Sequence, residues 1–156
     1  MPLDRVDRRL LDVLQTEGRL SNVALAERVH LSPSPCLRRL KALEHAGVIA
    51  GYRAMLDREA VGLGLTAFVE IKVEGHSEEV AAAMEAAVNA MPQVVSAHIV
   101  SGDADFLLEI VVPDLRSYER LLLGSLLKLP GVKDVRTNFA IRTVKAPSPL
   151  PLGHLA

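Results

Sequence analysis

The spacing of apolar residues changes near residue 60, and this change constrains the fold more than any other feature of the chain. Before it, apolar residues recur with a period close to 3.6, which is typical of short amphipathic helices. After it, apolar and polar residues alternate in runs that helical segments separate, which is typical of strands. One element cannot satisfy both periods. We therefore expect two domains, residues 1–60 and 61–145, with the boundary near Gly62 and Gly64.

The end of the chain has a third character. Residues 146–156 contain prolines at every second position from Pro147 to Pro151, and proline cannot donate a backbone hydrogen bond. We therefore expect a proline-rich C-terminal tail that contains neither helix nor strand.

The first domain is predicted to contain three helices followed by a hairpin. Three residues that are suited to cap a helix each precede an apolar run, namely Asp4, Ser21 and Ser32. The residues of the third helix that are expected to be buried are Leu37, Leu40 and Leu43. Residues 48–56 look like a short hairpin around Ala50 and Gly51. This order predicts a winged helix-turn-helix domain.

Positive charge is concentrated around the third predicted helix. The whole chain has 18 Lys and Arg against 19 Asp and Glu, so its formal net charge is −1. Residues 1–60 hold ten of the basic and eight of the acidic side chains, which gives +2 there and −3 in the rest. A DNA-reading helix needs one apolar side for docking and one polar, cationic side, and this helix has both. The pattern alone leaves open an ordinary three-helix bundle with solvated charges.

The second domain is predicted to be ferredoxin-like, with the element order βαββαβ. We expect strands over residues 65–73, 93–100, 106–112 and 132–144, and helices over 78–91 and 114–129. The third strand is apolar on both faces, because Leu107 and Val111 oppose Phe106, Leu108 and Ile110. A monomer does not expose such a face, so we expect it to pack against an identical sheet in a homodimer. The predicted fold class is therefore α+β.

Several stretches of the first domain resemble the Lrp/AsnC (leucine-responsive or feast-famine) family of transcription regulators. They are residues 3–8, residues 18–22 and the run Leu-Ser-Pro-Ser-Pro-Cys-Leu-Arg-Arg-Leu at 31–40, which is similar to the recognition helix of that family. The residues that the resemblance implies as DNA contacts are Ser32, Ser34, Pro35, Arg38, Arg39 and Lys41. Arg38 is expected to read bases, and the serines and Lys41 to hold phosphates. Cys36 is expected to be a packing residue rather than a redox sensor.

The second domain continues this resemblance, because the run Ser-Gly-Asp-Ala-Asp-Phe-Leu-Leu at 101–108 is similar to the effector-domain signature of the family. The resemblance implies homodimers that assemble into a tetramer or octamer and bind an amino acid between dimers. The residues that it implies as ligand contacts are Gly102, Asp103, Ala104, Asp105, Leu126, Leu127, Asn138, Phe139 and Ala140. Ala104 and Asn138 stand where family members carry an aromatic residue or tyrosine, so leucine is not assumed to be the effector.

The chemistry of residues 102–105 suits an amino acid. Asp103 or Asp105 can accept the ligand's ammonium group, and a turn that contains glycine presents backbone donors to its carboxylate. The residues alone leave open a plain hairpin turn, because Gly and Asp are common turn formers.

The sequence speaks against an enzyme and against a bound cofactor. The five histidines are dispersed, and there is neither a glycine-rich phosphate loop nor a nucleophile elbow. A single cysteine excludes an internal disulfide. The charged N-terminus and the absence of a long apolar run predict no secretory signal, no membrane partner and a cytoplasmic location.

We therefore interpret the chain as a sequence-specific, DNA-binding transcriptional regulator. Its oligomeric state or DNA affinity is expected to respond to an amino acid or a related small metabolite. Two alternatives stay open from the sequence: an amino-acid-binding regulatory subunit of an enzyme, and a nucleoid-type architectural DNA-binding protein.

Overall fold

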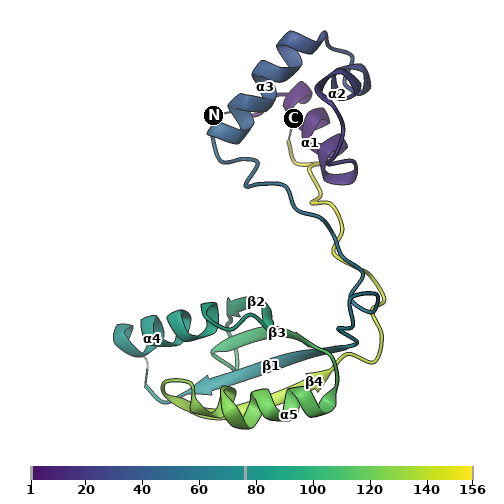
Figure 1. The fold of residues 1–156 in the computed structure, drawn as a ribbon. Coiled ribbons are helices and arrows are strands. Elements are labelled where there is room, and N and C mark those ends of the chain that lie inside the picture. The colour runs from purple at the N-terminus through teal and green to yellow at the C-terminus, as the bar shows by residue number, and fades with distance from the viewer. Residues whose placement is uncertain (1, 76, 156) are drawn as a thin grey trace. The chain divides into compact units, whose positions relative to one another are not determined.

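The contacts within the chain define two compact units (Figure 1), in a computed structural model that describes residues 2–75 and 77–155. The helical unit comprises residues 1–55 together with 144–156, and the α/β unit comprises residues 56–143. The division thus falls after residue 55 rather than after residue 60. The segment 146–156, which was predicted as a separate tail, belongs to the helical unit because Leu152 packs against the apolar core of the helices.

Three helices form the helical unit: α1 (Arg5–Thr16), α2 (Asn22–Arg28) and α3 (Pro33–His45). The Asp4 carboxylate accepts two backbone N–H groups of the first turn of α1, each at 2.8 Å, and the Ser21 hydroxyl caps α2. Both predicted caps are confirmed. Ser32 is the N-cap residue of α3, but its side chain makes no capping hydrogen bond within the described part of the chain. The buried apolar core of this unit consists of Leu10, Leu11, Leu25, Ala26, Val29, Cys36 and Leu43.

The buried side of α3 differs from the prediction at one position. Leu43 is fully buried and Leu40 is partly buried, but the Leu37 side chain is 40% exposed. Cys36 is fully buried instead. Steps of three residues fall short of the 3.6-residue turn and drift around the helix, whereas the spacing 36, 40, 43 stays on one side. The prediction of Leu37 as a core residue was therefore wrong.

The turn between α2 and α3 carries a strained residue. His30 has φ +57°, and it follows the C-cap of α2 where the N–H groups of His30 and Leu31 bond back to Glu27 and Ala26. This arrangement at a helix end favours glycine, since other residues rarely adopt positive φ. The corresponding position after α3 is occupied by Gly47, with φ +71°.

Replacing His30 with Gly is expected to stabilise the helical unit by about 0.5–1 kcal/mol, because the backbone strain is relieved and the exposed imidazole contributes little packing that could be lost. Urea unfolding followed by circular dichroism measures the change. Gly47→Ala is the matched control and is expected to destabilise the unit by about 1 kcal/mol, since no atom lies near its Cβ and only the backbone conformation is affected. Equal effects of the two substitutions would contradict this explanation.

The predicted hairpin at residues 48–56 is not formed. All nine residues are described, and none of them is in a strand. Tyr52, Met55 and Leu56 are between 53% and 77% exposed, so these side chains do not form a buried apolar face. A two-stranded hairpin without such a face is marginal in water. The Tyr52 hydroxyl donates to the Glu44 carboxylate at 3.1 Å, which fastens the start of this extended segment to the last turns of α3.

The α/β unit contains one four-stranded antiparallel sheet and two main helices. Its elements are β1 (Leu65–Val73), α4 (Glu78–Asn89), β2 (Val94–Ile99), β3 (Phe106–Val112), α5 (Leu115–Gly124), the short 3-10 helix η1 (Leu126–Lys128) and β4 (Val132–Phe139). The strand order is β2-β3-β1-β4. This order and the βαββαβ succession confirm the predicted ferredoxin-like fold, and the molecule is α+β.

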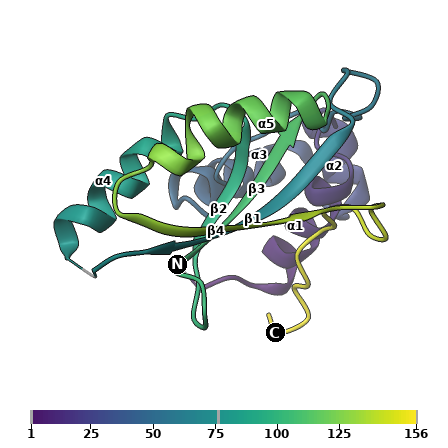
Figure 2. The same ribbon diagram turned by 90° about the horizontal axis from the view of Figure 1, so that it is seen from below.

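Both helices cover the same face of the sheet (Figure 2). The predicted alternation along β1 is confirmed, because Ala67, Val69 and Ile71 are fully buried under the helices. They pair with Ile110, Leu108 and Phe106 of β3 in the antiparallel register. The two helices complete this core with the side chains of Met84 and Val88 in α4 and of Tyr118 and Leu121 in α5.

The opposite face of the sheet is more polar than the apolar residues of β3 led us to expect. Phe68 and Leu107 lie on it, but Glu109 stands opposite Phe68 and Glu70 stands opposite Leu107. Arg58 donates to Glu109 at 2.8 Å and to the Thr66 hydroxyl at 3.0 Å, which covers part of β1 and β3. This face therefore mixes apolar side chains with ion pairs.

Candidate DNA and effector sites

Helix α3 presents one exposed polar row. Ser34, Arg38 and Lys41 are exposed and are spaced by four and three residues, so they lie along one side of the helix. Ser32 is exposed at the N-terminus, and Pro35 is half-buried next to the row. The positive end of the helix dipole favours a phosphate there, although Pro33 and Pro35 supply no backbone N–H. Such a row can contact both phosphates and base edges in a major groove.

Arg39 does not belong to this row, although it was predicted to face DNA together with Arg38. Its guanidinium donates to the Asp4 carboxylate at 2.7 Å and to the Asp7 carboxylate at 2.9 Å. Asp7 is only 6% exposed. Arg39 thus joins the middle of α3 to the capped N-terminus of α1. Its guanidinium is paired with carboxylates of the helical unit instead of extending from the exposed row.

The electrostatics of this cluster follow from its hydrogen bonds. The backbone N–H of Asp7 and then the Arg39 guanidinium hold the pKa of Asp4 below its ordinary value of 3.8. The hydrogen bonds from Arg39 to Asp4, and next in size to Asp7, raise the pKa of Arg39. We call Asp4, Asp7 and Arg39 the α1–α3 clasp. The sequence indicates Asp4 as a helix cap, but it contains no local signal that Arg39 is the partner of Asp4 and Asp7.

Asn22 and Cys36 position the start of α3. The Asn22 amide donates to the carbonyl of Pro33 at 2.8 Å, a contact between helices that the sequence analysis missed. Cys36 is 0% exposed, and burial raises the pKa of its thiol, so the neutral form is stabilised. The prediction of Cys36 as a packing residue is confirmed.

In the α/β unit, the loop at residues 102–105 joins β2 to β3. Gly102 has φ +124°, a backbone conformation that side chains rarely adopt. The Asp103 side chain is exposed. Asp105 is partly buried, and its carboxylate accepts the backbone N–H of Val73 at 2.9 Å while its own N–H donates to Ile71 at 3.0 Å. Asp105 therefore fastens this loop to the end of β1.

The remaining predicted effector residues lie in two places. Leu126 is fully buried in the core and Leu127 is 49% exposed, both in η1 just before β4. Asn138 and Phe139 are consecutive in β4, so they point to opposite faces of the sheet. Phe139 makes an edge-to-face contact with the Tyr118 ring, with the centroids 5.1 Å apart.

One chain does not bring all of these residues together. The 102–105 loop bonds to Val73 at one end of β1, whereas the Ala140 N–H bonds to Thr66 near the other end, at 2.9 Å. Seven residues of strand separate these two points, which corresponds to roughly 23 Å. Residues 102–105 and 138–140 therefore cannot contact one small ligand within one protomer.

A cavity of about 380 Å³ is lined by Gln93, Ser117 and Arg120 among others, and no predicted effector residue lines it. Within residues 2–75 and 77–155, no group of three or more His, Cys, Asp or Glu side chains is placed to hold a metal ion. In the same residues, no helix is long and apolar enough to cross a membrane.

Comparisons with known proteins agree with this geometry. The family model of a winged helix-turn-helix DNA-binding domain matches residues 3–50, and that of the Lrp/AsnC ligand binding domain matches residues 66–150. The leucine-responsive regulatory protein of Salmonella typhimurium is 46% identical over 143 residues, which cover 92% of this chain and 87% of that protein. The Escherichia coli K12 protein of the same name is 45% identical over equal shares.

Two solved structures show the same fold over nearly the whole chain. A transcriptional regulator of Neisseria meningitidis in complex with L-Met has a TM-score of 0.94 and 42% identity, with 99% of each chain covered. An AsnC family regulator of Agrobacterium tumefaciens has a TM-score of 0.93 and 36% identity, with 99% of this chain and 100% of that one covered.

A DNA-binding helix-turn-helix joined to a ligand-binding α/β domain defines a transcriptional regulator rather than an enzyme. The matches extend over both units and nearly the full length. The chain belongs to the Lrp/AsnC family of DNA-binding transcriptional regulators.

Proposed function

We propose that this regulator reads DNA through Ser32, Ser34, Pro35, Arg38 and Lys41 and works in the cytoplasm. The observation that carries the proposal is the exposed row on α3, which is polar and cationic while the opposite side of the helix is buried. Arg38 is the base-reading residue of the row, because a guanidinium pairs with guanine O6 and N7. Lys41 and the serines contact phosphates and set the register of the helix on the duplex.

The ligand that this proposal assigns to the α/β unit is an amino acid, held between copies of the chain. The relatives support it: one is crystallised with L-Met, and others are named leucine-responsive. The separation of residues 102–105 from 138–140 supports a site that two copies complete, since neither segment can reach the other in one protomer. A homodimer that assembles further into a tetramer or octamer supplies such neighbours.

The mechanism is linkage between ligand binding and DNA binding. An amino acid bound between copies stabilises one assembly over another, and the assemblies present their α3 helices with different spacing. DNA affinity then depends on ligand concentration, because an α3 pair of the wrong spacing cannot occupy two successive turns of the duplex. The +2 charge of residues 1–60 is modest, so tight binding relies on several linked units.

Arg38→Gln is the variant that tests the DNA site. We expect it to weaken binding to the protein's own promoter region by roughly 10- to 100-fold, because one charge-assisted base contact is lost. The matched control is Arg116→Gln, an exposed arginine of the α/β unit, which is expected to bind as wild type. Fluorescence anisotropy across a salt series measures both, and wild-type binding should weaken steeply with salt.

The same titration distinguishes this function from the two alternatives, a regulatory subunit of an enzyme and an architectural DNA-binding protein. Salt-independent binding, or equal affinities of the Arg38→Gln and Arg116→Gln variants, would contradict the DNA site and favour a regulatory subunit that binds protein. Equal affinity for promoter and unrelated DNA would favour an architectural protein. L-leucine and L-methionine added to the wild-type complex are expected to change its DNA affinity or its assembly mass.

A further inference from the structure

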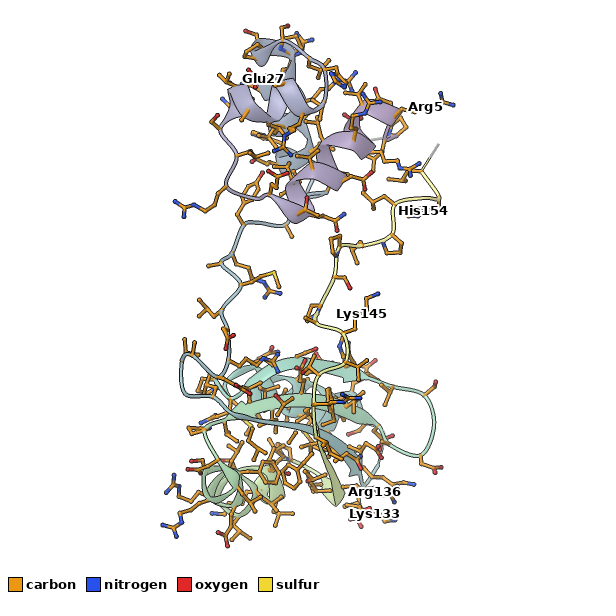
Figure 3. The ribbon with its side chains drawn as sticks, turned by 90° about the vertical axis from the view of Figure 1, so that its right-hand side faces the viewer. Arg5, Glu27, Lys133, Arg136, Lys145 and His154 are labelled. Atoms are coloured by element: carbon orange, nitrogen blue, oxygen red, sulfur yellow. The ribbon has the colours of Figure 1, made fainter. Side chains whose placement is uncertain are left out.

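The last residues of the chain return to α1 of the helical unit. The side-chain amide of Gln15 bonds to both backbone groups of Leu150: its carbonyl accepts the N–H at 2.6 Å, and its NH₂ donates to the C=O at 3.3 Å. Arg8 donates to the carbonyl of Leu155 at 3.1 Å. Figure 3 labels Lys145 and His154 on this segment. Residues 144–155, which we call the C-terminal strap, are thus bonded to α1 at two positions.

Leu152 gives the strap an apolar anchor. It is half-buried and packs against the core cluster that α1, α2 and α3 share. The N–H of Leu155 donates to the C=O of Leu152 at 3.0 Å, which closes a turn around this anchor. The side chain of Leu150, by contrast, is 70% exposed, so only its backbone takes part.

The composition of the strap suits docking. Pro147, Pro149 and Pro151 restrict the backbone before it binds, which lowers the entropy that is lost when the segment is ordered. Extended proline-rich segments also leave their backbone groups free for side-chain partners such as Gln15. The alternating prolines, which at first indicate only the absence of regular structure, therefore fit a docked segment.

The strap connects the end of the α/β unit to the helical unit, so its docking can affect both units. It follows β4 after residues 140–143, and the candidate effector residues 138–140 lie at the end of that strand and immediately after it. The chain passes between the two units twice, at residues 55/56 and 143/144. A domain held by one linker rotates with little restraint, whereas a second attachment restricts it and transmits displacements of the segment to which it is joined.

We propose that the C-terminal strap couples the effector segment at the end of β4 to the DNA-binding helices, by docking on α1 through Gln15, Arg8 and Leu152. A ligand that shifts residues 138–140 shifts the strap, and the strap changes the freedom of the helical unit. This inference rests on the proposed function for its ligand, but the docking itself rests on the contacts within the helical unit.

Two variants of the full-length protein remove the docking by different means. Leu152→Ser removes the apolar anchor, and Gln15→Ala removes both hydrogen bonds to Leu150 while keeping a good helix former in α1. Leu150→Ser is the matched control, because it makes the same substitution in the same segment at an exposed side chain. Hydrogen exchange of the Leu150 amide reports docking, and the ratio of DNA affinities with and without L-leucine or L-methionine reports coupling.

Both strap variants are expected to speed exchange at residue 150 by at least about tenfold, because an undocked segment opens freely. They are also expected to bring the affinity ratio close to 1, without changing the binding of the amino acid itself. Leu150→Ser is expected to keep the wild-type affinity ratio. Unchanged exchange in both variants, or faster exchange with the full wild-type ratio, overturns the proposal.

A wild-type protein that responds to neither amino acid would refute the effector part of the proposed function, which is a different failure. The strap is then judged on DNA affinity without ligand. In that case the Gln15→Ala and Leu152→Ser variants must bind the promoter at least about threefold more weakly or more tightly than Leu150→Ser, because the freedom of the helical unit has changed. Equal affinities overturn the proposal.

Discussion

Arg39→Gln is expected to destabilise the helical unit by about 1–2 kcal/mol while leaving the salt dependence of DNA binding unchanged. The guanidinium makes two charge-assisted hydrogen bonds in the α1–α3 clasp, and its removal leaves the buried Asp7 carboxylate without its cation. Partial exposure of Arg39 and Asp4 screens the pair, so the lower part of the range for charged hydrogen bonds applies. Urea unfolding measures the loss.

The adjacent residue supplies a matched control. Arg38→Gln makes the same substitution one position away, on the exposed side of α3. It is expected to change the free energy of unfolding by less than about 0.5 kcal/mol but to weaken DNA binding. Arg39→Gln is expected to show the reverse, with a salt slope equal to that of wild type because no phosphate contact is lost. A shallower slope for Arg39→Gln would show that Arg39 contacts DNA after all.

The destabilisation by Arg39→Gln is also expected to depend on pH. The pKa of Asp4 is lowered in the folded state, so its interactions stabilise the fold above the ordinary pKa of 3.8 and are lost as the pH falls through the lowered value. The difference between wild type and variant should therefore be complete at neutral pH and shrink below pH 4. Unfolding measured between pH 7 and pH 2.5 checks this. A difference that is constant across this range would mean that Asp4 is not part of the clasp.

The α1–α3 clasp could not be predicted from local sequence patterns. The periodic spacing placed Arg38 and Arg39 together off the apolar side of α3, because both are polar and adjacent. Which of them is paired depends on Asp4, 35 positions away, and a pattern within one helix contains no such information. The same limit applies to Leu37 and Cys36, whose burial depends on how α3 rotates against α1 and α2.

Elements whose signals are local were predicted well. The alternation along β1 identifies the buried Ala67, Val69 and Ile71 because a strand has a strict period of two. The capping residues of α1 and α2 are equally local. The hairpin at 48–56 was wrong because it has no apolar surface to pack on. Residues 146–155 of the tail contain neither helix nor strand, as predicted, but the sequence did not show that Leu152 packs on the core shared by the three helices.

For the candidate effector site, too, the sequence supplied the residues and the structure supplied their arrangement. Residues 102–105, 126–127 and 138–140 come from a family resemblance that lists contacts without saying which copy of the chain provides each. The structure adds that the first and last of these segments lie at opposite ends of β1. It also shows that Asp103 and Asp105, which look equivalent in the sequence, have different surroundings.

This difference leads to an expected separation of roles. Asp105→Ala is expected to destabilise the α/β unit by about 1–2 kcal/mol, because the partly buried N–H of Val73 loses its acceptor and the loop is no longer held to β1. Asp105→Asn retains an oxygen that can accept this N–H and should recover most of the loss. Thermal unfolding of the three proteins measures the effect.

Asp103→Asn is expected to leave the unfolding temperature within about 1 °C of wild type, because the side chain is exposed. It should nevertheless abolish the rise in unfolding temperature that L-leucine or L-methionine produces, since a neutral amide is a poorer acceptor for an ammonium group than a carboxylate. A full ligand response in Asp103→Asn, together with no response in the well-folded Asp105→Asn, would assign the ammonium to Asp105 instead. The exposed carboxylate would then be the turn former, and the one bonded to Val73 would hold both the loop and the ligand.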